Sequence, residues 1–243
     1  MRLLAILQFI VLLFISLTTI AQYKVSELDL DGDFENWYDQ KIGKNNAGII
    51  SGKYVEIKRV SKSSHQFFES ADWTPTTIKF RGQVYDSINL LYDIHSDMVC
   101  IQHPTNFALH NQAIELPKTQ VESFQLHGHL FRFMENVPAN RTPGFFDDLY
   151  QNELLGIVVK RVKSMELRQE VQFVENDFYF LKINQTYHRY WGKRTVFRLY
   201  KSYKPEIKKF IRNNNLELKP NQQNDADIVE LAIFLTSLNT GNE

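Results

Sequence analysis

Short runs of alternating or β-branched residues fill the middle of the chain, from about residue 52 to residue 184. Thr76, Ile78 and Phe80 alternate with polar or small neighbours, and residues 121–126 read Val-Glu-Ser-Phe-Gln-Leu. Turn signals separate such runs at intervals of about 8–12 residues, which is typical of antiparallel proteins. The pattern predicts a mainly β fold with C-terminal helices, in which the strands form an antiparallel sandwich or an open barrel. The strand-and-helix alternation that a parallel sheet requires is missing.

Four short polar segments interrupt these runs where hairpin turns are expected. Arg81-Gly82 and His127-Gly128 each separate two strand-like runs by two residues, and His95-Ser96-Asp97 separates two others. Asn176-Asp177 lies between residues 171–174 and 178–181, and both residue types tolerate the positive φ angles of a tight turn. The sequence therefore predicts hairpins at all four places.

The pattern becomes helical after Tyr190. Pro205 suits a first helical turn, and Ile207, Phe210 and Ile211 follow at helical spacing until three asparagines at 213–215 end the helix. Asn224 can cap a last helix, whose apolar face would consist of Ile228, Leu231, Ala232, Leu235 and Leu238. We expect an antiparallel β domain over residues 51–190 and two or three short helices within a basic region, 191–243, that packs on it.

The N-terminus has the features of an export signal. Arg2 precedes an apolar run that ends at Ile20, and the small Ala21 stands before polar Gln22. We expect a signal peptide over residues 1–21 with cleavage after Ala21, followed by a polar, acidic segment over residues 22–50. The alternative is an uncleaved anchor, because the apolar run approaches the ~20 residues that cross a bilayer. No later segment is apolar enough to span a membrane.

Composition narrows the class of protein further. Lys plus Arg and Asp plus Glu both number 28, so no net charge would draw the chain to nucleic acid. Aromatic residues reach 13%, with 18 Phe and 11 Tyr, and this richness favours strands. Cys100 is the single cysteine, so an intrachain disulfide is impossible. An export signal without disulfides suits the bacterial envelope, either the periplasm or the outside of the cell.

Several segments carry a resemblance to known proteins. These are the signal that ends in Thr-Thr-Ile-Ala-Gln, the segment VYDSINLLYD at residues 84–93, the aromatic GFFDDLY at residues 144–150, and a Lys-rich helix before a second helix. Together they resemble secreted, β-rich domains of Bacteroidota, over most of residues 50–238. The resemblance implies an exported protein with a β-rich fold. Because that group has no assigned chemistry, it implies no functional residues.

Asp29, Asp31 and Asp33 are the best candidates for a metal site near the N-terminus. Alternating carboxylates supply the hard oxygen ligands that calcium prefers. A calcium loop of the EF-hand type, however, needs Gly at its sixth position and Glu at its twelfth, where this chain has Phe34 and Gln40. A solvated acidic turn is the alternative, and no cofactor is expected elsewhere.

His127 and His129 form a second candidate metal site. Imidazoles two residues apart lie on one face of a regular strand, a spacing found in some zinc or iron sites. Here His127 falls in an expected turn, and a third ligand would have to come from afar, for example from His103 or His110. Two histidines of a hairpin turn are the alternative interpretation.

Motifs of catalysis are missing from the sequence. Cys100 stands between Val99 and Ile101, where a buried apolar role is more common than a nucleophilic one. Asp147 and Asp148 are adjacent, so on a strand they point to opposite faces and do not form a catalytic pair. With no catalytic or cofactor-binding residues to name, the sequence favours a protein that is not an enzyme.

Charge is distributed unevenly along the chain. Residues 186–220 contain ten Lys or Arg and only two acids, Glu206 and Glu217, a net charge of +8. Such a segment can contact an acidic glycan, a lipid surface or an acidic envelope protein, or it can be only a solvated helix face. The residues that we expect to bind a partner are Lys201, Lys204, Lys208, Lys209 and Arg212.

These observations favour a secreted or periplasmic, non-enzymatic binding module. The alternative is a glycan-binding or glycan-active protein, in which Trp37, Trp73 or Trp191 would stack on sugar rings. The position of these three side chains discriminates the two, because a glycan site needs them exposed along a groove. A third hypothesis, a hydrolase with dispersed catalytic residues, requires several polar groups converging in one pocket.

Overall fold

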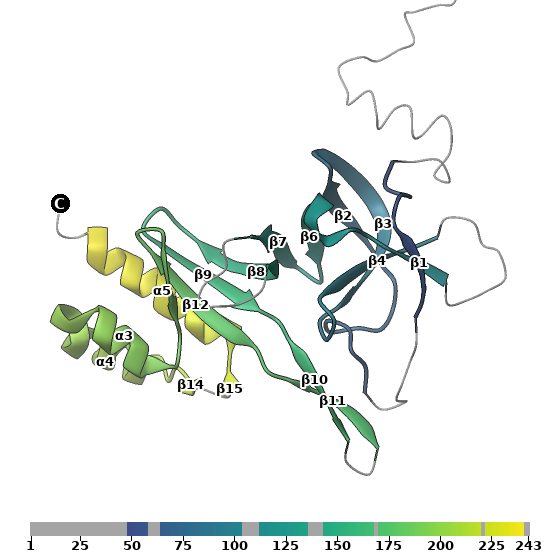
Figure 1. The fold of residues 1–243 in the computed structure, drawn as a ribbon. Helices are drawn as coiled ribbons and strands as arrows, with labels where there is room; N and C mark the ends of the chain where they lie inside the picture. Colours follow the sequence, from purple (N-terminus) through teal and green to yellow (C-terminus); the bar gives the residue numbers. More distant parts are fainter. Residues whose placement is uncertain are drawn as a thin grey trace, which may run out of the picture. The chain divides into compact units, whose positions relative to one another are not determined.

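An open antiparallel sheet dominates the computed structural model (Figure 1). The structure describes residues 48–57, 64–103, 112–135, 143–167, 170–219 and 222–240, all within one compact unit that spans residues 39–243. The expected signal and residues 22–47 of the acidic segment, with Asp29, Asp31, Asp33 and Trp37, lie outside the described residues. The predicted fold class is confirmed, because the described part of the protein is mainly antiparallel β and its α-helices follow Tyr190.

In the described residues the sheet contains eleven strands in the order β1-β5-β4-β3-β2-β6-β7-β8-β9-β12-β13. The strands β1 and β13 form its two edges, so the sheet does not close on itself. The eleven strands are β1 (Lys53–Glu56), β2 (Thr74–Phe80), β3 (Gln83–Asp93), β4 (Met98–Gln102), β5 (Gln112–Glu115), β6 (Val121–Leu126), β7 (His129–Met134), β8 (Gly144–Gln151), β9 (Leu155–Lys160), β12 (Phe178–Ile183) and β13 (Thr186–Arg189).

Shorter elements complete the fold. Two further antiparallel pairs are β10 (Lys163–Leu167) with β11 (Val171–Glu175), and β14 (Leu218–Lys219) with β15 (Gln222–Gln223). The helical elements are η3 (Lys118–Gln120), α3 (Lys193–Leu199), η5 (Lys201–Tyr203), α4 (Lys204–Asn213) and α5 (Asp225–Thr240).

Three of the four predicted hairpins are present. Arg81 and Gly82 join β2 to β3 with φ angles of 53° and 82°, and His127 and Gly128 join β6 to β7 with 50° and 86°. Positive φ at both central residues matches the twist of adjacent strands. At the third turn, Asp93 pairs with Met98 across the loop, and the Asp93 carboxylate accepts hydrogen bonds from the next backbone amides.

The hairpin predicted at Asn176-Asp177 is wrong. The strands on either side do not pair with each other, because β11 pairs with β10 and β12 pairs with β9 and β13. Neither residue has positive φ. Instead, the amide of Asn176 donates to the carbonyl of Val162 at 2.8 Å, and the Asp177 carboxylate accepts from the amide of Val162 at 3.1 Å. These long-range bonds hold the segment extended, and no local sequence feature reports them.

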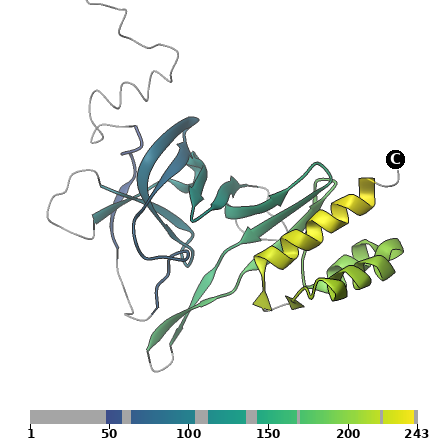
Figure 2. The same cartoon turned by 180° about the vertical axis from the view of Figure 1, so that it is seen from behind.

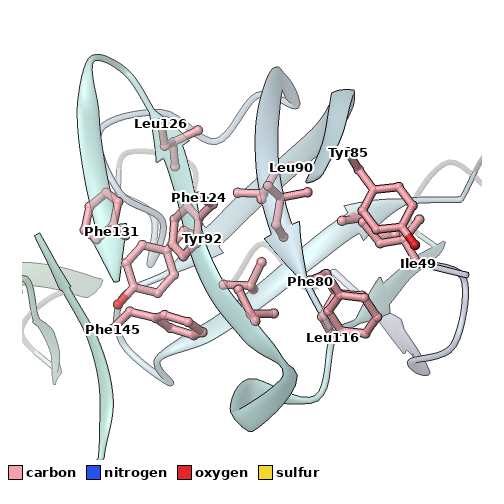
Figure 3. Packing of buried hydrophobic residues seen from close by; sticks show 14 of the residues in the cluster. Ile49, Phe80, Tyr85, Leu90, Tyr92, Leu116, Phe124, Leu126, Phe131 and Phe145 are labelled. Atoms are coloured by element: carbon pink, nitrogen blue, oxygen red, sulfur yellow. The ribbon is translucent and has the colours of Figure 1, made fainter. Parts of the chain in front are cut away.

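Aromatic side chains fill the core under β2–β8. Figure 3 shows Tyr92, Phe124, Phe131 and Phe145 packed together, with ring centroids 5.0–5.8 Å apart around Tyr92. Edge-to-face pairs at this spacing add about 0.5–1.5 kcal/mol each beyond burial of their area. Many of the Phe and Tyr residues that the composition contains are therefore buried in this core.

A second core joins the sheet to the helices. Ile157 and Val159 of β9 pack with Val196 of α3, Ile207 of α4 and Leu231 of α5. The helix α5 runs alongside this part of the sheet (Figures 1 and 2). The helices α3 and α4 lie on the side of α5 that faces away from β8 and β9. The helices that the structure describes all fall short of the length and hydropathy that a membrane span needs.

The two predicted apolar helix faces are largely buried. Asn224 caps α5, because its side-chain oxygen accepts from the amide of Ala226 at 3.0 Å. Four of the predicted face residues of α5 are buried and Leu238 is partly buried. Phe234, outside that face, stacks on Phe210 of α4 with ring centroids 4.0 Å apart. Because α5 packs against both sheet and helix, its sequence is apolar beyond a single stripe.

Candidate functional site

A break in the β9–β12 ladder brings together a group of charged residues. Regular pairing of β9 with β12 ends at Lys160 opposite Phe178. Pairing resumes between β10 and β11 at Lys163 opposite Glu175. Between these pairs, Arg161 leaves the ladder and its Nη1 donates to Asp177 Oδ2 at 2.8 Å. Interruptions of a ladder commonly redirect side chains in this way.

Arg161 binds three carboxylates at once. Its Nε donates to Asp147 Oδ2 at 2.9 Å, and its Nη2 lies 2.5 Å from both Asp147 Oδ2 and Asp225 Oδ2. The side chain is only 7% exposed. Burial opposes the charged form, but the hydrogen bond to Asp225 and the attraction of the carboxylates outweigh it and raise the pKa of Arg161. The guanidinium is therefore a permanent buried cation that joins β8, the ladder break and α5.

His129 extends this network toward solvent. Its Nδ1 lies 2.8 Å from Asp147 Oδ2, and its Nε2 lies 3.6 Å from Glu69 Oε1. The hydrogen bond to Asp147 stabilises the imidazolium and raises the pKa of His129, against partial burial and the charge of Arg161. The ring also packs edge-on against Phe68, with centroids 5.1 Å apart.

A cavity of about 490 Å³ opens beside the network. The hydroxyl of Tyr179 donates to Asp225 Oδ1 at 2.6 Å on its wall. The three nitrogens of Arg161 are all engaged by carboxylates, so the guanidinium is not available to an anionic ligand. The lining residues are Phe68, Glu69, Ile94, His129, Arg161, Glu175, Asp177, Tyr179, Asn224 and Asp225. They include no serine, cysteine or lysine, so the cavity does not present the nucleophile that a His-Asp pair would activate.

One group of potential metal ligands lies in the same network. Ligand atoms of His129, Asp147 and Asp225 are within 4.8 Å of one another. The Nη2 atom of Arg161, however, is 2.5 Å from a carboxylate oxygen of both aspartates. The guanidinium thus occupies the place of a cation between them, and a divalent ion there would face a fixed positive charge. We interpret the group as an ion-pair network that connects the sheet to α5.

The two predicted metal ligands, His127 and His129, do not both join the group formed by His129, Asp147 and Asp225. His127 lies in the turn and His129 begins β7, and both rings contact Phe68 from 6.3 Å and 5.1 Å. Only His129 belongs to the group of potential ligands found in the described residues. His103 lies elsewhere, with its Nε2 3.1 Å from the hydroxyl of Tyr54, and His110 is outside the described residues.

The basic segment forms an exposed layer on α3, η5 and α4. Within α4, Ile207 is buried, and Phe210 and Ile211 are partly buried against the helical core. The opposite side presents cations to solvent. We call them the basic layer, and they are Lys193, Arg194, Arg198, Lys201, Lys204, Lys208, Lys209 and Arg212, all exposed.

The cations of the basic layer have no ion-pair partners in the described protein. Ion pairs between described residues occur in the sheet, its loops and the start of α5, and none involves a residue of α3, η5 or α4. Lys204 and Lys208 contact the Phe197 ring instead, at 5.8 Å and 5.9 Å. All five residues predicted to bind a partner belong to this layer.

The tryptophans do not form a row. Trp191 is 55% exposed, but the Arg189 guanidinium covers its ring at 4.0 Å. Trp73 is partly buried and packs against the small cluster around Phe67 and Cys100. Among the described residues, the exposed aromatic groove that a glycan site would need is therefore not built from tryptophan.

Two expectations about chemistry agree with the structure. Cys100 is fully buried, and burial raises the pKa of its thiol to about 12. Asp147 and Asp148 have separate partners, since Asp147 binds Arg161 and Asp148 accepts from Arg132 Nε at 2.9 Å. The thiol is thus shielded, and the two adjacent acids bind different cations.

No sequence pattern marks Arg161, Asp177 or Tyr179 as members of a site. Nothing in their spacing connects positions 129, 147, 161, 177 and 225; the one local sign is a basic run, Lys160 to Lys163, inside a strand-rich region. Comparisons with family models, curated proteins and solved structures found no match for this chain. The function of the chain must therefore be inferred from its own geometry.

Proposed function

We propose that this chain is a non-enzymatic binding module, exported to the bacterial cell envelope, that contacts an acidic surface through its basic layer. One observation carries the proposal: eight exposed cations share one helical layer, and none has an ion-pair partner among the described residues. The chain as a whole has no net charge. The positive charge is thus concentrated in the helical segment from α3 to α4.

Electrostatics makes such a layer suited to capture. Close to an anionic membrane surface, each Lys or Arg contributes about 1 kcal/mol of attraction. The attraction fades with salt, because the Debye length falls from ~10 Å at 0.1 M to ~3 Å at 1 M. The charged cavity at Arg161 fits an ion-pair network, because its cation is saturated by carboxylates and its lining has no serine, cysteine or lysine beside the His-Asp pair.

Reversal of charge on α4 tests the proposal. A variant with Lys208→Glu, Lys209→Glu and Arg212→Glu should lose capture on an acidic surface at low salt, for which bilayers with phosphatidylglycerol are a defined probe. Its melting temperature should hardly change, because these side chains are exposed. The matched control, Lys208→Arg with Lys209→Arg and Arg212→Lys, should retain capture. Capture that survives both the reversal and high salt would show that the layer is only a solvated face.

Export has its own test. We expect protein recovered from the cell envelope to begin at Gln22, because Ala21 precedes it as the small residue that a signal peptidase requires. N-terminal sequencing decides this. Envelope protein that still begins at Met1 would show that the chain is not cleaved after Ala21.

A further inference from the structure

A second cavity adjoins the basic layer at Lys201. It has a volume of about 390 Å³ and forms where the loop before β9, the β12–β13 turn and η5 meet. This volume is within the range of small-molecule sites, about 300–1,000 Å³. The lining residues are Leu154, Ile183, Asn184, His188, Leu199, Tyr200, Lys201, Ser202 and Tyr203.

The polar part of this lining suits an anion. Lys201 supplies an ammonium group, Ser202 a hydroxyl donor and His188 an imidazole, and the lining contains no Asp or Glu. Within the described part of the chain, the side chains of these three residues have no hydrogen bond or ion pair. Their donors are therefore available to a ligand, and nothing acidic in the cavity opposes a negative charge.

Three aliphatic side chains form the apolar part of the lining, beside Asn184, Tyr200 and Tyr203. Leu154 is 38% exposed, and Ile183 and Leu199 are partly buried against the helical core. A ligand that contacts both parts has an anionic group attached to an apolar body. A free inorganic anion would leave these leucine and isoleucine side chains in contact with water.

We propose that this cavity binds the phosphate headgroup of an anionic phospholipid. The inference rests on the proposed function, since the basic layer would bring the protein to an anionic bilayer and the cavity would hold one lipid of it. Lys201 belongs to both, so the cavity opens at the same surface as the layer. The phosphate lies among Lys201, Ser202 and His188, and the glycerol and first acyl carbons contact Leu154, Ile183 and Leu199.

A titration with a soluble lipid separates the cavity from the layer. Dihexanoyl phosphatidylglycerol, kept below its micellar concentration, is titrated into the protein as isolated from the cell, and binding is followed by calorimetry. Ser202→Glu places a negative charge in the cavity, and Asn213→Glu makes the same charge change at the exposed end of α4. We expect Ser202→Glu to weaken binding by at least about tenfold, or ~1.4 kcal/mol, and Asn213→Glu to change it less than twofold.

Two further arms identify the ligand. Dihexanoyl phosphatidylcholine and inorganic phosphate should each bind much more weakly than the phosphatidylglycerol. Leu154→Gln, at a partly exposed loop position, should weaken binding of the lipid but not of inorganic phosphate. This variant replaces Ser202→Glu as the test of the cavity if Ser202→Glu lowers the melting temperature.

Several results would overturn the inference. They are equal effects of Ser202→Glu and Asn213→Glu, equal binding of the phosphatidylcholine, or inorganic phosphate that binds as tightly as the lipid. The proposed function fails separately, when the triple reversal on α4 leaves capture on bilayers intact. Because the soluble lipid presents no surface, its titration does not depend on that outcome.

Discussion

The Nη2 atom of Arg161 lies 2.5 Å from Oδ2 of Asp225, so a residue at a break in the β ladder is joined to the first residue of the last helix. The two positions are 64 residues apart. The same guanidinium binds Asp147 of β8 and Asp177 before β12. One side chain therefore connects three strand segments and a helix.

Removal of this cation should destabilise the protein strongly. Arg161→Met leaves Asp147, which is almost fully buried, without its permanent cation and with His129 alone as a partner, and we expect a loss of about 3–5 kcal/mol in the free energy of unfolding. Lys79→Met is the control, since Lys79 and Glu122 are 44% and 42% exposed, and it should cost less than about 1 kcal/mol. Chemical denaturation measures both. Equal losses would contradict a structural role for the network.

The network should also make stability depend on pH through His129. Its pKa in the folded protein is raised above the ordinary 6.5, first by the hydrogen bond to Asp147, with a contribution from Glu69 and opposition from Arg161. The stabilisation is therefore full below about pH 6.5 and is lost as the pH rises through the folded pKa. The difference in unfolding free energy between the natural protein and His129→Gln should shrink over this range. A difference that grows with pH would contradict the assignment.

Cys100 should be unreactive in the folded protein. A thiol with a pKa of about 12 is ionised to roughly one part in ten thousand at pH ~8, and the side chain is fully buried. We expect a chromogenic disulfide reagent to leave the folded protein unmodified and to modify one thiol per chain after unfolding in guanidinium. Rapid modification without denaturant would show that this strand opens easily.

The stacked pair Phe210 and Phe234 should couple α4 to α5. Their rings are parallel within 4° at 4.0 Å, so a double-mutant cycle with Phe210→Ala and Phe234→Ala should give a coupling energy of about 0.5–1.5 kcal/mol. Ile233→Ala is the control on the same helix, because Ile233 is 55% exposed and should cost little. Additive losses in the cycle would indicate that the two helices do not depend on this contact.

Local pattern alone determined much of the architecture. Two-residue turns with Gly at the second position, as at Arg81-Gly82, specify a hairpin because few residues tolerate positive φ. Helical spacing of Ile207, Phe210 and Ile211, and the cap at Asn224, depend only on neighbours within one or two turns. The exposure of the basic layer follows from the same spacing, because residues opposite an apolar helix stripe face solvent.

Only the tertiary structure decided where the charged network and the two cavities lie. Asn176-Asp177 has the composition of a hairpin turn, yet bonds to Arg161 and Val162 keep it extended and bring Asp177 into the network. His129 was paired in sequence with His127, but its partner is Asp147, 18 residues away. The cavity at Lys201 likewise takes Leu154 and His188 from separate strands and loops. Contacts at such separations depend on how the strands order themselves in the sheet, and that order is set by burial of side chains across the whole core rather than by residues close together in the chain.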